Sequence, residues 1–237
     1  AVTVTTTLIF LPWVMQGFGD VLTVISRLFP LQRGLFEDKV ANIWCSLSLI
    51  LKLRNLFSNS TLAEFSSVLS LLFAAPFAID ALWQQNARGN EPLSRSRLVR
   101  NFSGSALACF LFGYQVHEKQ ILLPLIPLAF LINEAPFLVL WFSMVGSFSL
   151  LPLLSRDGLS LPYGVTQIIQ LLVLFTGVEN TQLSVQRTLQ ASVAGGLILH
   201  GLLCFAPRIE RYPDIYVYLI SIYSCAHFCI LYCILLV

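Results

Sequence analysis

Apolar residues run along this chain in long stretches that short polar segments interrupt. A helix that crosses a membrane needs about 20 mainly apolar residues. On that basis the pattern predicts about eight spans, at residues 2–15, 64–83, 98–114, 120–132, 136–154, 161–178, 189–206 and 215–237. We find no soluble domain, low-complexity tract or internal repeat. The pattern therefore predicts an all-α polytopic membrane protein, with residues 1–237 in a single transmembrane domain.

Two of these stretches carry further information. The stretch 120–132 is short and contains Pro124 and Pro127, so we expect a kinked or tilted helix there. The stretch 2–15 reads as a helix already under way, with no initiator Met and no basic segment before it. We therefore expect this sequence to be the later portion of a longer protein.

The composition agrees with a membrane protein. Hydrophobic residues make up 57% of the chain and charged residues 11%, and the mean hydropathy is +0.79. Soluble domains carry about 25% charged residues. The chain therefore has too few charges to cover a water-exposed surface, which excludes an ordinary cytosolic enzyme, a nucleic-acid-binding domain and a disordered chain. The net charge of +2 gives no argument for a polyanionic partner.

The segment 16–63 is long for a loop between spans, and long loops tend to be functional. Residues 20–29 alternate apolar and polar positions at helical spacing, which predicts a helix lying on the membrane surface, and Pro30 ends it. Residues 40–53 are apolar and could form a further span, which would reverse the side of everything before them, but they number only 14 and include Lys52. We expect an interfacial or re-entrant helix there.

Basic residues set the predicted orientation. The loop 84–97 is the most basic short loop, so the positive-inside rule places it in the cytoplasm. Counting spans from this loop places the turn at His117, the turn at Arg156, the loop 207–214 and the segment 16–63 together on the opposite, lumenal side. A glycosylation sequon at residues 59–61 agrees, whereas a second one at 101–103 begins a span.

Ionisable residues beside apolar helices are the candidates for chemistry, because a charge near hydrocarbon is costly. His117, Glu118 and Lys119 stand between two spans with almost no loop. His117 and Lys119 can hold a phosphate through charge-assisted hydrogen bonds, with Glu118 orienting either one. An interfacial turn with Lys119 reaching the lipid headgroups is an equally good interpretation.

A second candidate group lies in the segment 16–63. Arg33 and Lys39 can meet an anionic ligand, Glu37 and Asp38 can accept hydrogen bonds from sugar hydroxyls, and Trp44 can stack on a sugar. Both features also have a structural explanation. The two carboxylates can stabilise the start of the apolar helix at residue 40, where they oppose the positive end of its dipole, and the tryptophan can anchor the helix at the membrane interface.

The remaining candidates point to packing. Cys225, Cys229 and Cys233 share one face of a helix, which suits small packing residues better than a disulfide or a metal site. His227 lies within an apolar span and is expected to pair inside the bundle, as is His200. Asp80 is expected to mark a helix end.

Residues 27–30 (RLFP), 33–45 (RGLFEDKVANIWC) and 112–119 (FGYQVHEK), followed by Ile121-Leu122-Leu123, carry a family resemblance. They resemble the C-terminal portion of the dolichyl-phosphate-glucose-dependent α-1,3-glucosyltransferases of the endoplasmic reticulum membrane. Two enzymes of that family act in succession, and both have the His-Glu-Lys turn. The run 34–42 is similar to the enzyme that adds the first glucose, with the second enzyme as the alternative.

The resemblance implies an inverting transferase of the GT-C fold that works in the lumen without a metal ion or other cofactor. It implies dolichyl-phosphate-glucose as donor and the nine-mannose dolichyl-diphosphate oligosaccharide as acceptor. The family's general base lies in an earlier lumenal loop, so no catalytic residue is carried over here and residues 1–237 alone are expected to be inactive. A transporter or lipid scramblase is the rival class, but it favours polar residues within several spans.

Overall fold

The computed structural model describes residues 2–28, 39–87, 94–178, 183–207 and 209–237, and these residues form helices with no strand among them. The elements in chain order are α1 (Val2–Gln16), α2 (Phe18–Leu28), α3 (Ile43–Ser48), α4 (Leu53–Leu56), α5 (Asn59–Ala87), α6 (Arg95–Phe112), the 3₁₀ turn η1 (Glu118–Ile121), α7 (Leu122–Leu128), the 3₁₀ turn η2 (Ala129–Leu131), α8 (Pro136–Ser149), α9 (Leu151–Arg156), α10 (Ser160–Val178), α11 (Leu183–Phe205) and α12 (Ile215–Leu236). The predicted all-α class is confirmed.

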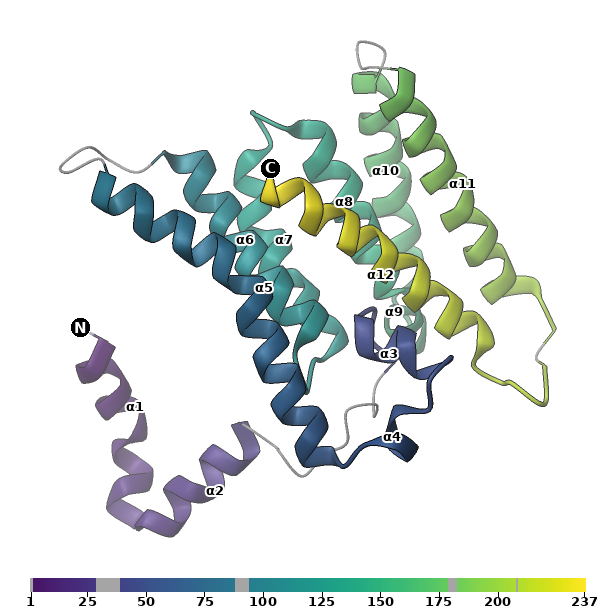
Figure 1. Cartoon of the computed structure of the whole chain (residues 1–237). Coiled ribbons are helices and arrows are strands. Elements are labelled where there is room, and N and C mark those ends of the chain that lie inside the picture. The colour runs from purple at the N-terminus through teal and green to yellow at the C-terminus, as the bar shows by residue number, and fades with distance from the viewer. Residues whose placement is uncertain (1, 29–38, 88–93, 179–182, 208) are drawn as a thin grey trace.

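The helices from α5 to α12 run back and forth between two ends of a bundle (Figure 1). We call the lower end in that view, with residues 113–117, 157–159 and 209–214, the His117 end. We call the upper end, with the start of α6, residues 132–135 and the C-terminus, the Arg97 end. The predicted sharing of one side by the turns at His117 and Arg156 and the loop before α12 is confirmed.

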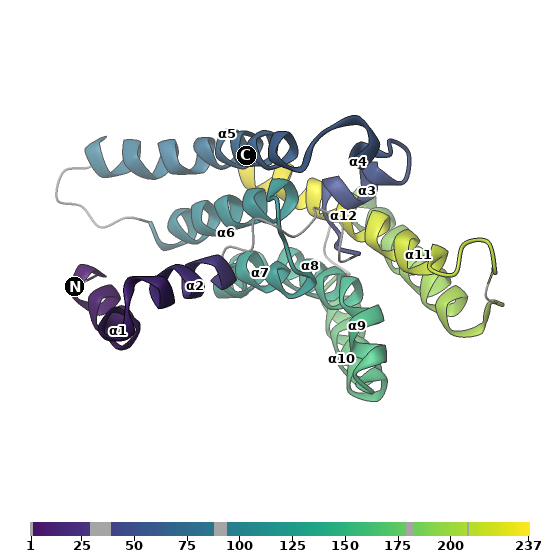
Figure 2. The ribbon, with the colours of Figure 1, turned by 90° about the horizontal axis from the view of Figure 1, so that it is seen from below.

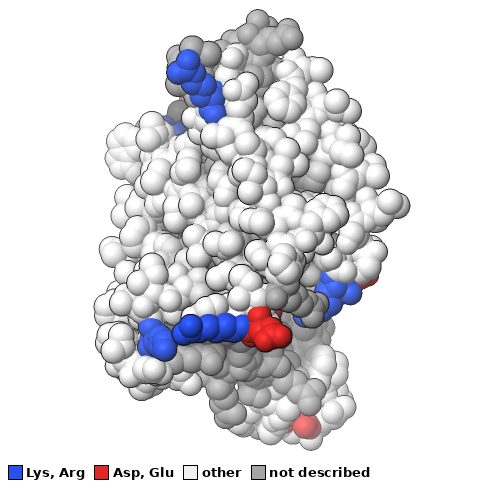
Figure 3. All heavy atoms as spheres, turned by 90° about the vertical axis from the view of Figure 1, so that its right-hand side faces the viewer, with Lys and Arg blue, Asp and Glu red and all other residues white. Residues whose placement is uncertain are grey.

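Uncharged residues form a broad band between these two ends. Figure 3 shows the Lys, Arg, Asp and Glu side chains of one face near its top and bottom, with uncharged residues between them. Within the described residues, three stretches are long and apolar enough to cross a membrane: Asn59–Gln84, Val185–Phe205 and Ile215–Leu236. Only 17%, 11% and 44% of their most apolar windows are buried in the protein, which leaves apolar surface to face lipid.

Two of the predicted spans are not single α-helices. The stretch 120–132 folds as η1, α7 and η2 in succession, with Pro124 and Pro127 both within α7. The kink or tilt expected there stays a prediction. The stretch 136–154 was expected to be one helix, but α8 ends at Ser149 and α9 begins at Leu151. Pro152 explains this correction, because proline has no N–H to donate and its ring clashes with the carbonyl four residues earlier.

The segment 16–63 contains three short helices among its described residues. The helix expected at residues 20–29 is confirmed as α2. The single helix expected at residues 40–53 is wrong, because α3 covers Ile43–Ser48 and the next helix, α4, begins at Leu53. Neither is long enough to cross a membrane. Figure 2 shows α3 and α4 near the start of α12, at the His117 end.

Packing between α6, α8 and α12 forms the centre of the bundle. Leu107 and Leu111 of α6, Phe142 of α8, and Phe228 and Leu231 of α12 are all buried in one hydrophobic cluster. The rings of Phe110 and Phe228 meet edge to face at 5.7 Å. This packing fixes α6, and with it the chain that leaves its C-terminal end.

Candidate functional site

The turn that follows α6 carries the candidate residues of the His117 end. The helix ends at Phe112 because Gly113 turns into an extended conformation, with its N–H bonded to the carbonyl of Cys109 at 2.8 Å. A Cβ on Gly113 would press on that carbonyl and lie 2.8 Å from Cγ2 of Val116. Only glycine therefore fits this exit from the helix without a shift of the backbone.

His117, Glu118 and Lys119 lie at the start of η1. The backbone N–H of His117 donates to Oε1 of Gln120 at 3.2 Å, and Ile121 is fully buried at the end of the same turn. The side chains of His117 and Lys119 are exposed and that of Glu118 is half-buried. A turn fixed at both ends thus presents two basic side chains at the surface of the bundle, which suits an anionic ligand.

Lys39 lies against the start of α12. Its ammonium group is 2.5 Å from Oδ2 of Asp214 and 5.5 Å from the ring centroid of Tyr218. Its carbonyl oxygen accepts a hydrogen bond from Oγ of Ser221 at 2.9 Å. Lys39 therefore has a carboxylate partner within the protein. Asp214 was missed by the sequence reading, and its place just before the apolar run of α12 was the available signal.

Trp44 lies on α3, which Asn42 caps by accepting a hydrogen bond from the N–H of Cys45 at 2.9 Å. The ring of Trp44 is only 6% exposed and packs with Leu53 and Leu62. Its indole N–H donates to the carbonyl of Phe112 at 2.8 Å. The buried ring has little free face for a sugar. Its stacking on a sugar stays a prediction, and the burial of the ring argues against it.

Three predicted site residues, Arg33, Glu37 and Asp38, lie outside the described residues. The alternative that the two carboxylates begin the apolar helix is wrong, because α3 begins at Ile43 with Asn42 as its cap. Among the described candidates, the structure brings Trp44 to the base of the turn that carries His117. Lys39 contacts α12 instead.

Comparison with known proteins decides the family. The family model described as the ALG6, ALG8 glycosyltransferase family matches residues 1–235. The chain belongs to this family. It is 47% identical over 149 residues to the dolichyl pyrophosphate Man9GlcNAc2 alpha-1,3-glucosyltransferase of Gallus gallus, a match that covers 63% of this chain and 28% of the relative.

Two longer matches extend over most of the chain. The enzyme of the same name from Rattus norvegicus is 36% identical over 234 residues, covering 87% of this chain and 45% of the relative. The probable enzyme of that name from Schizosaccharomyces pombe is 33% identical over 235 residues, covering 96% and 44%. This ALG6, ALG8 family chain therefore spans less than half the length of the curated relatives it matches.

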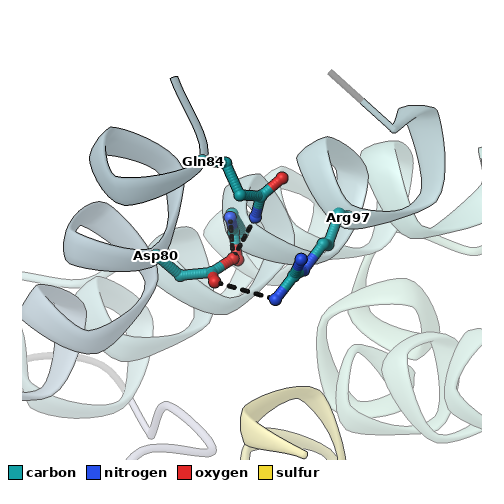
Figure 4. A network of polar contacts seen from close by, with 4 residues as sticks. Asp80, Gln84 and Arg97 are labelled. Atoms are coloured by element: carbon teal, nitrogen blue, oxygen red, sulfur yellow. Dashed lines mark hydrogen bonds and ion pairs between the residues drawn. The ribbon is translucent and has the colours of Figure 1, made fainter. Parts of the chain in front are cut away.

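The Arg97 end of this ALG6, ALG8 family chain holds a polar network that the sequence reading missed (Figure 4). The carboxylate of Asp80 accepts hydrogen bonds from Nε2 of Gln84, from Nδ2 of Asn101 at 2.8 Å and from Nη2 of Arg97 at 3.2 Å. Gln84 and Asn101 are buried. The network joins α5 to α6, and within the second sequon Asn101 and Ser103 are buried.

His227 belongs to a group of polar side chains within the spans that pair with one another in the bundle. His227 contacts Oγ of Ser192 through Nε2 and the carbonyl of Tyr223 through Nδ1, each at 2.8 Å. The same Ser192 hydroxyl accepts from the indole N–H of Trp141 at 2.9 Å. The prediction that His227 pairs inside the bundle is confirmed, and these contacts link α8, α11 and α12.

Proposed function

We propose that the protein containing this chain transfers glucose in α-1,3 linkage to the Man9GlcNAc2 oligosaccharide on dolichyl diphosphate, in the assembly of the N-glycan precursor. The observation that carries this proposal is the match to relatives named for that reaction, at 36% identity over 87% of the chain in Rattus norvegicus. Their name specifies the nine-mannose acceptor, which supports the first enzyme of the family over the second.

The donor in this proposal is dolichyl-phosphate-glucose. The acceptor hydroxyl attacks the anomeric carbon, a base takes its proton, and the bond to the phosphate oxygen breaks with its electrons staying on dolichyl phosphate. A phosphate is already a good leaving group, so no general acid is required. Cationic groups that contact this phosphate lower the barrier, because negative charge grows on it as the bond breaks.

His117 and Lys119 are the groups that fit this role best among the described residues. Both are exposed on a turn whose flanking residue Ile121 is fully buried. Lys39 is a weaker candidate because its charge is already paired with that of Asp214. The side chain of His117 also has a partner in the protein, but that partner is the uncharged backbone N–H of Gln120. Arg33, Glu37 and Asp38 stay candidates from the sequence, as does Glu118 for orienting either basic side chain.

We place the enzyme in the endoplasmic reticulum membrane in a GT-C fold, with about eight spans in this chain and the His117 end in the lumen. The support is the basic loop 84–97, which the positive-inside rule assigns to the cytoplasm. The ion pair between Lys39 and Asp214 puts part of the segment 16–63 at the His117 end. A cysteine introduced as Asn90→Cys should be labelled from the cytoplasmic side of intact microsomes, and labelling from the lumen would overturn this orientation.

The test of the activity uses the complete enzyme in membranes with labelled dolichyl-phosphate-glucose and the nine-mannose lipid acceptor. Glucosylated acceptor is the expected product, and its absence from an expressed, folded enzyme would contradict the reaction. His117→Ala and Lys119→Ala should each lower kcat about 10- to 100-fold, with expression maintained, because each removes a contact that strengthens in the transition state. Asp157→Ala is the control, since Asp157 is an exposed charge in another turn of the same end. Wild-type turnover in both basic-residue variants would refute the phosphate role.

A further inference from the structure

The carbonyl of Phe112 is held by two side chains from other helices. Phe112 is the last residue of α6, where a helix leaves its final carbonyls without partners from the helix itself. The indole N–H of Trp44 donates to this oxygen at 2.8 Å, and Oγ of Ser66 donates to it as well. A carbonyl oxygen has two lone pairs, so both are occupied.

This junction joins three helices inside the protein. Trp44 belongs to α3, Ser66 to α5 and Phe112 to α6, and their exposed fractions are 6%, 0% and 8%. The ring of Phe112 also stacks on Phe73 of α5, with a centroid distance of 4.1 Å and 17° between the planes. Both the backbone oxygen and the side chain of Phe112 are therefore fixed.

The chain that leaves this junction leads directly to His117. The backbone at Gly113 runs so close to the carbonyl of Cys109 that no side chain fits there. The next residue, Tyr114, packs against the cluster that contains Trp44. At the far end of the turn the fully buried Ile121 holds the chain again. The segment whose two exposed basic side chains are the candidates for the donor phosphate therefore follows a fixed residue, Phe112, and ends at a buried one, Ile121.

We propose that Trp44 and Ser66 are positioning residues, which fix the turn carrying His117 and Lys119 by jointly binding the Phe112 carbonyl. This inference rests on the proposed function. It gives Trp44 a different role from the sugar platform that its residue type suggests, because its one polar atom points inward to the backbone. In this proposal the six-residue helix α3 holds the indole N–H of Trp44 against the C-terminal end of α6.

The test uses the complete enzyme with Trp44→Phe, which keeps an aromatic ring and removes the N–H, and Ser66→Ala, which removes the hydroxyl. Each variant loses one buried hydrogen bond, and we expect kcat to fall about 3- to 10-fold with KM for the acceptor changed less than twofold. Trp141→Phe is the matched control. Trp141 is also 6% exposed and its indole N–H also donates a hydrogen bond, at 2.9 Å, but to Ser192 in a different part of the bundle.

Combined variants separate positioning from a general loss of structure. In a background that carries both His117→Ala and Lys119→Ala, Trp44→Phe and Ser66→Ala should each reduce kcat further by less than twofold, because their effect passes through the turn that holds these two side chains. Trp141→Phe should give the same small change in either background. Ser66→Ala keeps the test decisive if Trp44→Phe expresses poorly, since it removes a single atom.

Two failures are distinguishable. If His117→Ala and Lys119→Ala lower kcat while Trp44→Phe and Ser66→Ala match Trp141→Phe, the positioning role is wrong and the proposed function stands. The same conclusion follows if the effects of Trp44→Phe and Ser66→Ala multiply with that of the combined His117→Ala and Lys119→Ala substitution. If His117→Ala and Lys119→Ala both keep wild-type turnover, the phosphate role is wrong, and the positioning role falls with it.

Discussion

Removal of the Asp80 carboxylate should destabilise the Arg97 end of the bundle strongly. Asp80→Ala leaves the amide of Gln84 and the amide of Asn101 without their acceptor, and these side chains are only 2% and 7% exposed. A buried donor that loses its partner costs about 1–3 kcal/mol. The guanidinium of Arg97 is 37% exposed, so the loss of its ion pair adds at most about 1 kcal/mol.

Together these three losses should lower the free energy of unfolding by about 2–4 kcal/mol. This is the low end of their sum, because polar groups in membrane proteins can find other hydrogen-bond partners when one is removed. The buried thiols of Cys45 and Cys225 provide an assay once the exposed thiols of the described residues, Cys109, Cys204 and Cys233, have been blocked, since a maleimide dye then labels the buried thiols only when the bundle opens. Thermal unfolding of the detergent-solubilised enzyme, followed by this dye, should show a transition several degrees lower for Asp80→Ala.

Two comparisons identify the cause. Asp157→Ala removes an exposed carboxylate from the turn between α9 and α10, and it should change stability by less than about 0.5 kcal/mol. Asn101→Ala should be costly in the wild type and nearly neutral in the Asp80→Ala background, because the two side chains share one bond. Equal transition temperatures for Asp80→Ala and Asp157→Ala would refute the reasoning.

Two further predictions concern the His117 end. Gly113→Ala should destabilise the enzyme by about 1–3 kcal/mol in the same unfolding assay, because its Cβ meets the carbonyl of Cys109, whereas Gly164→Ala, in open space within α10, should be neutral or stabilising by up to about 1 kcal/mol. A double-mutant cycle of Lys39→Ala and Asp214→Ala should give a coupling of about 0.2–1 kcal/mol that weakens with salt, since the two side chains are 30% and 50% exposed; a coupling above about 2 kcal/mol, or one unaffected by salt, would contradict this.

The sequence by itself determined the helical class, the placement of most helices and which loops share an end. These follow from hydropathy and helical spacing, which are local properties of the chain. The helix over residues 20–29 was readable from its apolar stripe, which α2 confirms. The family resemblance was likewise carried by short contiguous runs.

Local patterns were less informative where a helix begins or ends. The segment 40–53 looked like one apolar helix, yet Asn42 caps a helix of six residues and the chain then turns before α4. The apolar residues of α3 are there to be buried against other helices, with Trp44 and Cys45 inside the protein. Hydropathy cannot separate burial in protein from burial in lipid, because both favour the same residue types.

Only the tertiary structure decided the polar contacts that define the candidate site. Trp44 and Phe112 are 68 positions apart, and Ser221 donates to the carbonyl of Lys39 across 182 positions. Asp80 and Asn101 come from two helices joined by a loop. Each of these residues has an ordinary local explanation, as an anchor, a charge or a helix end. Their partners depend on how the helices pack, which arises from the summed burial of many side chains and not from any one stretch of sequence.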